Sequence, residues 1–269
     1  MVERVLLTGA AGRIGSCLRV GLRAGLRELR LSDVAPLRAE HPNETVAPAD
    51  LGDAEAVARA AEGVDAIVHL GGEAGEAALD ALLEPNVRGV FHVLDAARRA
   101  DARRVVLASS NHVTGFYDAG VPLEGGEPVR PDSLYGVTKA FAEALGRMYA
   151  DKFGLEVVCL RIGTFGERPT AARQMATWLS PGDAVRLVAA CLSAPSPLGF
   201  VIAYGASANS RGWWDLGPAR RLGYEPRDDA EAFAAELGEA SRDEPQGAEF
   251  ADPHYGGWAQ SSGTRSTAS

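Results

Sequence analysis

The sequence predicts an α/β fold in which helices cover both faces of a parallel sheet. Short apolar runs alternate along the chain with longer alanine-rich stretches, and the runs lie at 4–7, 29–32, 65–70, 103–110 and 156–162. Such alternation is typical of parallel strands joined by right-handed helical crossovers. Because the runs are mostly apolar rather than alternating, both faces of the sheet are expected to be buried. These observations predict a doubly wound sheet.

Helices are expected between the strands, and their patterns lie near 13–24, 53–61, 76–100, 134–152 and 181–193. The third is expected to be interrupted around Pro85, because proline cannot donate a helical hydrogen bond. After about residue 163 the pattern loosens, and it indicates only a strand at 199–205 and an acidic helix around 229–239. These pieces predict a small C-terminal helical cap.

Composition narrows the class of partner. The chain has 269 residues, enough for one large domain, and its 36 acidic and 27 basic side chains give a net charge of -9. It lacks the basic cluster that follows a nucleic-acid backbone, a bilayer-spanning apolar run and a secretion signal. The three cysteines are far apart, without metal-ligand spacing. We expect a cytoplasmic protein with no metal, nucleic-acid or membrane partner.

A glycine-rich turn follows the first strand and begins the first helix. The stretch "LLTGAAGRIG" places Gly9, Gly12 and Gly15 at intervals of three, with Arg13 and Ile14 in the same turn. Glycines here permit a tight turn, close approach of backbone N–H groups to a diphosphate and close packing of the helix on the sheet. The spacing differs from the usual GxGxxG, and three glycines alone are equally compatible with simple backbone relief.

The ends of the following strands favour a dinucleotide. Asp33 ends the second strand, where a carboxylate accepts from both ribose hydroxyls and repels a 2′-phosphate. NAD is therefore predicted over NADP, although Arg38 keeps NADP open. Asp50 and Leu51, at the next strand end, suit an adenine, and the end of the fourth strand supplies Leu70, Gly71 and Gly72 near the phosphates.

A tyrosine and a lysine four residues apart follow the fifth strand. On a helix, Tyr135 and Lys139 lie on one face, so the ammonium is expected to favour the phenolate and make Tyr135 a base. Ser110, at the end of the fifth strand, is placed to hold the substrate oxygen. The pair alone is equally typical of an exposed amphipathic helix. Combined with the glycine-rich turn, Asp33 and Ser110, it predicts catalysis.

These motifs resemble those of the short-chain dehydrogenase/reductase superfamily, and residues 1 to about 165 are similar to its extended, epimerase-like branch. Across nearly the whole chain, the stretches "VHLGG", "SSNHVTGFY", "RIGTF" and "SANSRGWWD" resemble uronate dehydrogenases. The resemblance implies a Rossmann-like NAD-binding core at 1–165, cap elements and the last strand at 163–240, and a polar tail at 241–269 within one domain. It also implies a homo-oligomer.

The resemblance further implies oxidation of a hexuronic acid at C1, which produces an aldarolactone and NADH while Tyr135 removes the hydroxyl proton. Lys139 would also bind the nicotinamide ribose. The implied cofactor contacts include Arg13, Ile14, Asn86, Ser109, Ile162 and Phe165. The implied substrate contacts are Ser110, Asn111, His112, Tyr135, Thr164 and Arg173, with position 74 completing the set.

Arg173 is the residue that indicates an acidic sugar as substrate, because a guanidinium can bind a carboxylate through two parallel hydrogen bonds. Its alternative is an ordinary surface ion pair. His112 is expected to bind a hydroxyl or merely to pack, since no second metal ligand has suitable spacing. Ala74 stands where the family carries a serine, with Glu73 beside it, and Thr164 replaces another serine. These departures leave the predicted redox residues unchanged and bear on which substrate binds.

Three alternatives remain. A dehydrogenase of another sugar or polyol would account for Ala74 and Glu73. A sugar-nucleotide epimerase or dehydratase shares the fold but generally needs a larger C-terminal domain. A redox-sensing NAD-binding module typically lacks the tyrosine and lysine. The tail beyond residue 240 is rich in Ser and Gly and is expected to have little regular structure, although its aromatic residues suggest docking on this subunit or a neighbour: Phe250, Tyr255 and Trp258.

Overall fold

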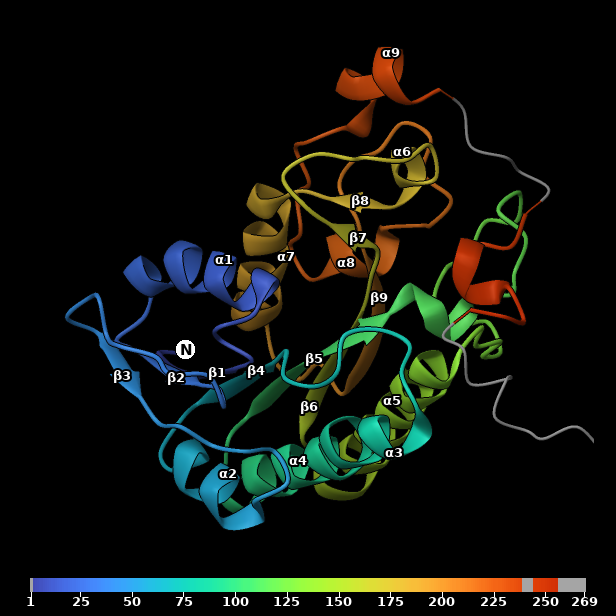
Figure 1. Ribbon diagram of the computed structural model, residues 1–269. Helices are drawn as coiled ribbons and strands as arrows, with labels where there is room; N and C mark the ends of the chain where they lie inside the picture. The colour runs from blue at the N-terminus through green and yellow to red at the C-terminus, as the bar shows by residue number, and fades with distance from the viewer. Residues whose placement is uncertain (1, 239–243, 256–269) are drawn as a thin grey trace, which may run out of the picture.

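The computed structural model describes residues 2–238 and 244–255, so Trp258 lies outside the described residues. In this part of the chain a parallel sheet of seven strands has the order β3-β2-β1-β4-β5-β6-β9 (Figure 1). The predicted doubly wound α/β fold is confirmed. The strands are β1 Arg4–Thr8, β2 Glu28–Ser32, β3 Glu44–Val46, β4 Ala66–His69, β5 Arg104–Ser110, β6 Glu156–Ile162 and β9 Phe200–Gly205.

Two layers of helices enclose the sheet (Figure 1). On one face lie α1 and α7, and on the other α2, α4 and α5. Successive residues of β1 serve the two layers, because Val5 and Leu7 join one apolar core and Leu6 joins the other. The helices are α1 Arg13–Leu22, α2 Ala54–Ala61, α4 Gly89–Arg99, α5 Leu134–Phe153 and α7 Pro181–Ser193.

The predicted interruption at Pro85 is present. A short helix, α3 Leu79–Leu82, passes into a π-helical turn, η2 Leu83–Arg88, and then into α4. Pro85 has no N–H to donate, and the wider turn lets the helix continue past it. The same turn places Asn86 facing the protein interior.

The cap covers one end of the sheet (Figure 1). Its small parallel sheet pairs β7 Thr164–Phe165 with β8 Trp178–Leu179, neither of which the sequence indicated. The expected acidic helix consists of two short turns, η4 Ala230–Phe233 and α9 Ala234–Leu237. The remaining elements are η1 Arg23–Gly25, η3 Asn111–Thr114, α6 Gln174–Thr177, α8 Gly217–Arg221 and η5 Ala248–Ala251. Among the described helices, none combines the length and apolarity needed to cross a membrane.

A buried charge network joins α5 to the sheet and the cap. Glu143 of α5 accepts from Arg161 of β6 through two hydrogen bonds of 2.9 Å and from the Ser109 hydroxyl at 2.6 Å. Arg161 also donates to the Tyr204 hydroxyl at 3.3 Å, and that ring stacks on Trp214 of the cap. The Arg161 and Glu143 side chains are 1% and 5% exposed. The network therefore holds the orientation of α5 from within the core.

We expect Glu143→Leu to lower the free energy of unfolding by about 3 kcal/mol, because Arg161 would remain charged and buried with only the longer contact to Glu127, at 3.9 Å. The exposed pair Arg147–Asp151 on the same helix is the matched control. Arg147→Ala should change the free energy by less than about 1 kcal/mol. Urea unfolding measures both, and equal losses would show that the buried pair does not hold α5 in place.

Candidate active site

The N-terminus of α1 has the features that a diphosphate needs. Helix α1 begins at Arg13 after Gly12, has no side-chain cap and carries no acidic residue in its first turn. Three of the other long helices are capped by side chains, at Asp53 for α2, Ser133 for α5 and Ser180 for α7, whereas α4 continues directly from η2. The uncapped N–H groups and the positive end of the α1 dipole fit the diphosphate of a dinucleotide.

Two of the predicted glycines are required by close backbone packing. Gly9 has φ +69°, and a Cβ there would lie 2.6 Å from the Gly71 nitrogen. A Cβ on Gly15 would lie 2.1 Å from the Gly9 carbonyl oxygen. The loop after β1 therefore packs against the loop after β4 as only glycine allows. Backbone packing alone thus requires glycine at both positions, and the nucleotide site is indicated by the uncapped start of α1.

Acidic residues border this loop. Asp33, one residue after β2, accepts from the Ala11 N–H at 2.9 Å and the Ala35 N–H at 3.0 Å. Each carboxylate oxygen keeps a lone pair for a ribose hydroxyl. Asp50 and Leu51 lie in the turn before α2, a few residues beyond β3 rather than at its end.

The loop after β4 is held by Asn86. Its side-chain oxygen accepts from the Glu73 N–H at 2.8 Å, and its amide nitrogen donates to the Glu73 carbonyl at 3.0 Å and to Thr138 at 3.2 Å. Asn86 therefore positions Gly71 and Gly72 through the backbone. Its direct contact with cofactor stays a prediction.

Several predicted cofactor residues lie where β6 and β7 meet the loop. Arg13 donates to the Phe165 carbonyl at 2.9 Å, which links the glycine-rich loop to the cap. Ile14, Leu70 and Ile162 line a small apolar cavity. Ser109 differs from these residues, because its hydroxyl is committed to Glu143, and only its backbone is available to a cofactor.

Tyr135 and Lys139 share one face of α5, as predicted. The Lys139 ammonium lies 5.4 Å from the centroid of the Tyr135 ring and donates to the Ala108 carbonyl at 3.0 Å. Burial lowers the pKa of Lys139 to about 8. The helix start is capped by Ser133 and by Glu76, whose carboxylate accepts from the Tyr135 N–H at 2.9 Å.

The pKa of Tyr135 is raised to about 12, chiefly by burial and further by Glu73. A hydrogen bond with Ser110 acts in the opposite direction. Burial thus disfavours the phenolate in the protein without cofactor. That Lys139, together with the positive charge of a bound nicotinamide, makes Tyr135 a base stays a prediction. The Ser110 contact places the two predicted catalytic hydroxyls together.

His112 is fixed by a carboxylate. Its Nδ1 lies 2.8 Å from Oδ2 of Asp132, which is buried, and its backbone N–H donates to the Ser110 hydroxyl at 3.2 Å. The ring meets Tyr135 edge to face, with centroids 6.0 Å apart. Because a carboxylate accepts at Nδ1, Nε2 is the nitrogen left for a ligand. His112 is thus positioned beside the predicted base.

Arg173 lies just before α6 and is held by neutral oxygens. Its Nε donates to the Gln246 carbonyl at 2.6 Å, and Nη1 to the Thr164 hydroxyl at 3.4 Å. Asn111, with its amide oriented to satisfy its neighbours, donates to the Ile162 carbonyl at 3.1 Å and accepts from Arg173 Nη2 at 2.8 Å. The structure brings these predicted substrate residues together.

Within residues 2–238 and 244–255, no carboxylate forms an ion pair with Arg173. Burial lowers its pKa, although the more distant Glu249 and Asp132 oppose that effect. Guanidinium stays protonated even so. A partly buried cation without an ion-paired carboxylate is a candidate site for an anion.

Sequence reasoning missed four residues at this site: Glu76, Asp132, Glu143 and Gln246. Glu143 is eight residues beyond Tyr135, so its place on the same helical face was a usable signal. Glu76, Asp132 and Gln246 lie in loops and the tail, where no periodicity indicates direction. Ala74 is exposed in the loop after β4, beside Glu73.

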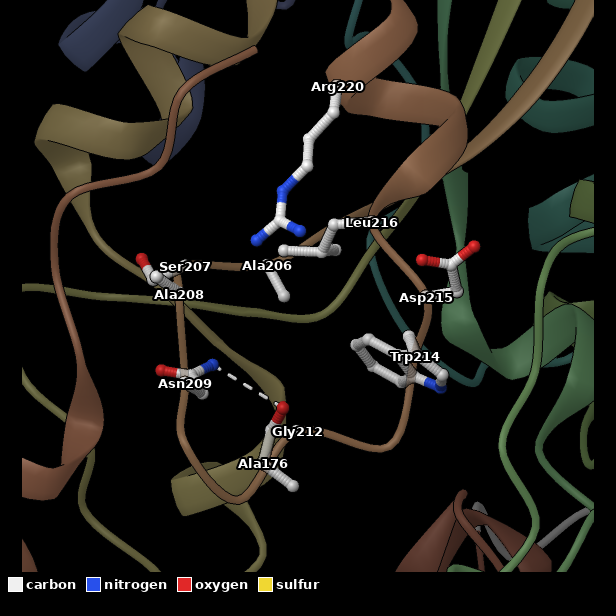
Figure 2. Close-up of a pocket in the computed structure, with 10 residues that line it drawn as sticks. All are labelled: Ala176, Ala206, Ser207, Ala208, Asn209, Gly212, Trp214, Asp215, Leu216 and Arg220. Carbon is white, nitrogen blue, oxygen red and sulfur yellow. Dashed lines mark hydrogen bonds between the residues drawn. The ribbon is translucent and has the colours of Figure 1, made fainter.

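A separate cavity of about 190 Å³ lies in the cap, between α6, the loop at 206–216 and α8 (Figure 2). Asn209 crosses its wall with a hydrogen bond to the Ala176 carbonyl, and the Trp214 ring and Arg220 border it. None of the predicted site residues lines this cavity. The "SANSRGWWD" segment thus builds the cap rather than the reaction site.

The fold and site define a nucleotide-binding oxidoreductase scaffold, and comparison with known proteins agrees. Residues 5–186 match the model of the NAD dependent epimerase/dehydratase family. A uronate dehydrogenase of Pseudomonas putida is 45% identical, with 87% of each chain covered. The chain therefore belongs to this NAD-dependent family, and the predicted family and cofactor are confirmed.

Solved structures show the same likeness. A tyrosine-to-alanine variant of uronate dehydrogenase from Agrobacterium tumefaciens, complexed with NAD, superposes with a TM-score of 0.88 at 41% identity, covering 94% of this chain and 98% of that chain. A glucuronic acid dehydrogenase from Chromohalobacter salexigens has a TM-score of 0.89 at 39% identity, covering 95% and 99%.

We expect Lys139→Met to stabilise the protein without cofactor by on the order of 2 kcal/mol at pH 7, because it removes a buried ammonium. The pKa of Lys139 falls from 10.5 to about 8 on folding, so the unfolded chain binds more protons between these values. The difference in free energy of unfolding between variant and parent should be largest below about pH 8 and should decrease as the pH rises toward 10.5. Urea unfolding at pH 7 and pH 10 measures it. A less stable variant at pH 7 would mean that the bond to Ala108 outweighs burial.

Proposed function

We propose that the protein oxidises a hexuronic acid at C1 with NAD and releases the aldarolactone. One observation carries the substrate class: the Arg173 guanidinium is partly buried and bonded to neutral oxygens, with no ion-paired carboxylate among the described residues. A substrate carboxylate completes this arrangement through charge-assisted hydrogen bonds. The similarity to uronate dehydrogenases supports the same assignment.

The residues have distinct roles in this reaction. NAD, when bound, accepts the hydride from C1 and brings a positive nicotinamide ring. Tyr135 removes the proton of the C1 hydroxyl, and Ser110 holds the same oxygen, as their mutual hydrogen bond indicates. Lys139 stays beneath the Tyr135 ring, held by the Ala108 carbonyl. The C1–H bond would break with its electron pair leaving as hydride, while the O–H proton passes to the Tyr135 phenolate and the O–H electron pair forms the carbonyl double bond of the lactone.

The other contacts orient the sugar. His112 presents Nε2 because Asp132 holds Nδ1, so it suits a sugar hydroxyl. Asn111 and Thr164 touch Arg173 and set the plane of its guanidinium. A sugar bound between Arg173 and Tyr135 therefore has its carboxylate and its anomeric carbon at opposite ends.

A second function, oxidation of a neutral sugar or polyol, is favoured by Ala74 and Glu73. Ala74 offers no hydroxyl, and Glu73 adds a negative charge that raises the pKa of Tyr135. Glu73 is exposed, however, so solvent screens its repulsion of a uronate. The partly buried Arg173 outweighs it in our assignment.

We further propose a cytoplasmic homo-oligomer. Free thiols at Cys17, Cys159 and Cys191 suit a reducing compartment. Apolar side chains are exposed on α4 and α5, among them Phe91, Val137 and Phe141. Sedimentation of the purified protein tests the assembly.

A substrate panel tests the function. The purified protein is mixed with NAD and with glucuronate, galacturonate or the corresponding neutral aldoses, and NADH absorbance is followed. Turnover of uronates well above that of aldoses is expected. Rapid turnover of aldoses with none of uronates would favour the second function.

Arg173→Ala should raise the uronate KM about 10–100-fold, because it removes charge-assisted hydrogen bonds of roughly 1.5–3 kcal/mol. Arg173→Lys keeps the charge but loses the planar fork, so its uronate KM should lie between those of Arg173→Ala and the parent. NAD affinity, measured by fluorescence titration, should not change. Equal losses for uronate and NAD would make Arg173 a structural residue.

Tyr135→Phe should lower kcat by at least about 100-fold, since general-base catalysis contributes on this order. The substitution keeps the ring that lies over Lys139, so NAD affinity is the internal control. Oxidation at the parental rate would remove Tyr135 from the mechanism.

A further inference from the structure

The described part of the tail, residues 244–255, runs beside the loop after η3. Ala119 donates to the Glu244 carbonyl at 3.0 Å, and Gln246 donates to the Tyr117 carbonyl at 2.8 Å. The Gly247 N–H continues the ladder to the Gly115 carbonyl at 2.8 Å. In Figure 1 the red C-terminal turn lies against this green loop. We call residues 244–255 the strap.

Gln246 anchors the strap inside the protein. Its side-chain oxygen accepts from the Trp214 indole N–H at 2.8 Å, and its amide nitrogen donates to the Asp118 and Val121 carbonyls at 3.2 and 3.0 Å. The residue is 1% exposed. All of its amide hydrogen-bonding groups have partners, so the side chain has one orientation.

The backbone of Gln246 reaches the substrate site directly. Its carbonyl accepts from Arg173 Nε at 2.6 Å. Because Nε lies in the plane of the guanidinium, this bond fixes the plane in which the two terminal nitrogens can meet a carboxylate. The strap also covers the other side of the site, where Phe250 stacks on His112 with centroids 3.8 Å apart.

We propose that Gln246 is a positioning residue for recognition of the substrate carboxylate, an inference that rests on the proposed function. The Trp214 indole and the two loop carbonyls hold its side chain, and its carbonyl then aims Arg173. Without this anchor, Arg173 would retain its charge but sample several orientations. The strap thereby supplies preorganisation, which lowers the cost of ordering the site when substrate binds.

The test compares Gln246→Ala and Gln246→Glu with the parent in the full chain. In Gln246→Glu, the carboxylate can still accept from the Trp214 indole N–H, but it has no N–H to donate to the Asp118 and Val121 carbonyls. Both variants should raise the uronate KM about tenfold, while kcat and NAD affinity stay within about twofold. Glu244→Gln, an exposed change in the same strap, is the matched control and should behave as the parent.

A double-mutant cycle with Arg173→Ala decides the mechanism. If Gln246 acts through Arg173, Gln246→Ala should lower kcat/KM for uronate in the parent but by less than about twofold in the Arg173→Ala background. An equal loss in both backgrounds would overturn the proposal, as would an unchanged KM in the single variant.

A second variant covers the case in which Gln246→Ala does not fold. Trp214→Phe keeps an aromatic ring on Tyr204 but removes the indole N–H, and it should show the same KM-selective loss. A loss confined to kcat would contradict the proposal. Failure of the proposed function itself appears separately, as a parent enzyme that produces no NADH from uronates.

Discussion

The bidentate contact of Glu143 with Arg161 is the constraint on which the reaction site depends. Tyr135, Lys139 and Glu143 follow one another at intervals of four, so one helical face carries the base, its cation and the anchor. The anchor is bonded to β5 and β6 through Ser109 and Arg161. Rotation of α5 about its axis would break this buried pair before it could move Tyr135 away from Ser110 at the end of β5. The burial of the Glu143–Arg161 pair therefore keeps Tyr135 in position beside Ser110.

Two further cations near the site, unlike Arg161, have no carboxylate bonded to them among the described residues. Lys139 is buried and Arg173 is partly buried; both donate to backbone carbonyls, and neither has an ion-paired carboxylate among the described residues. Burial lowers the pKa of each. An ion pair would stabilise either cation, but it would also neutralise the charge that a phenolate or a substrate carboxylate needs. Leaving Lys139 and Arg173 without carboxylate partners thus lowers local stability but keeps their charges available, whereas the Glu143–Arg161 pair is fully compensated.

The sequence predicted the core better than the cap because the core elements are periodic. Continuous apolar runs identified most strands within one or two residues, and the glycine spacing located the loop whose close contacts Gly9 and Gly15 require. The third strand, Glu44–Val46, has only three residues, too few for a pattern, so its end was expected at Asp50 and Leu51 instead. The ionisation of Tyr135 was not predictable from its spacing to Lys139, since burial of the phenol is a property of the assembled fold. Gln246 lay in a polar tail whose composition suggested little structure.

The tail nevertheless completes the site, and the geometry of the sheet explains why. Strands β1, β4, β5 and β6 end at one edge, so their loops can surround the nucleotide from below and from the sides. In the proposed function the substrate lies beyond that edge, between the cap and the strap at 244–255. Arg173 of the cap donates to the Gln246 carbonyl of the strap, and Phe250 of the strap stacks on His112. In that proposal, substrate class depends on two segments more than seventy residues apart in sequence, Arg173 and Gln246, which meet at one guanidinium.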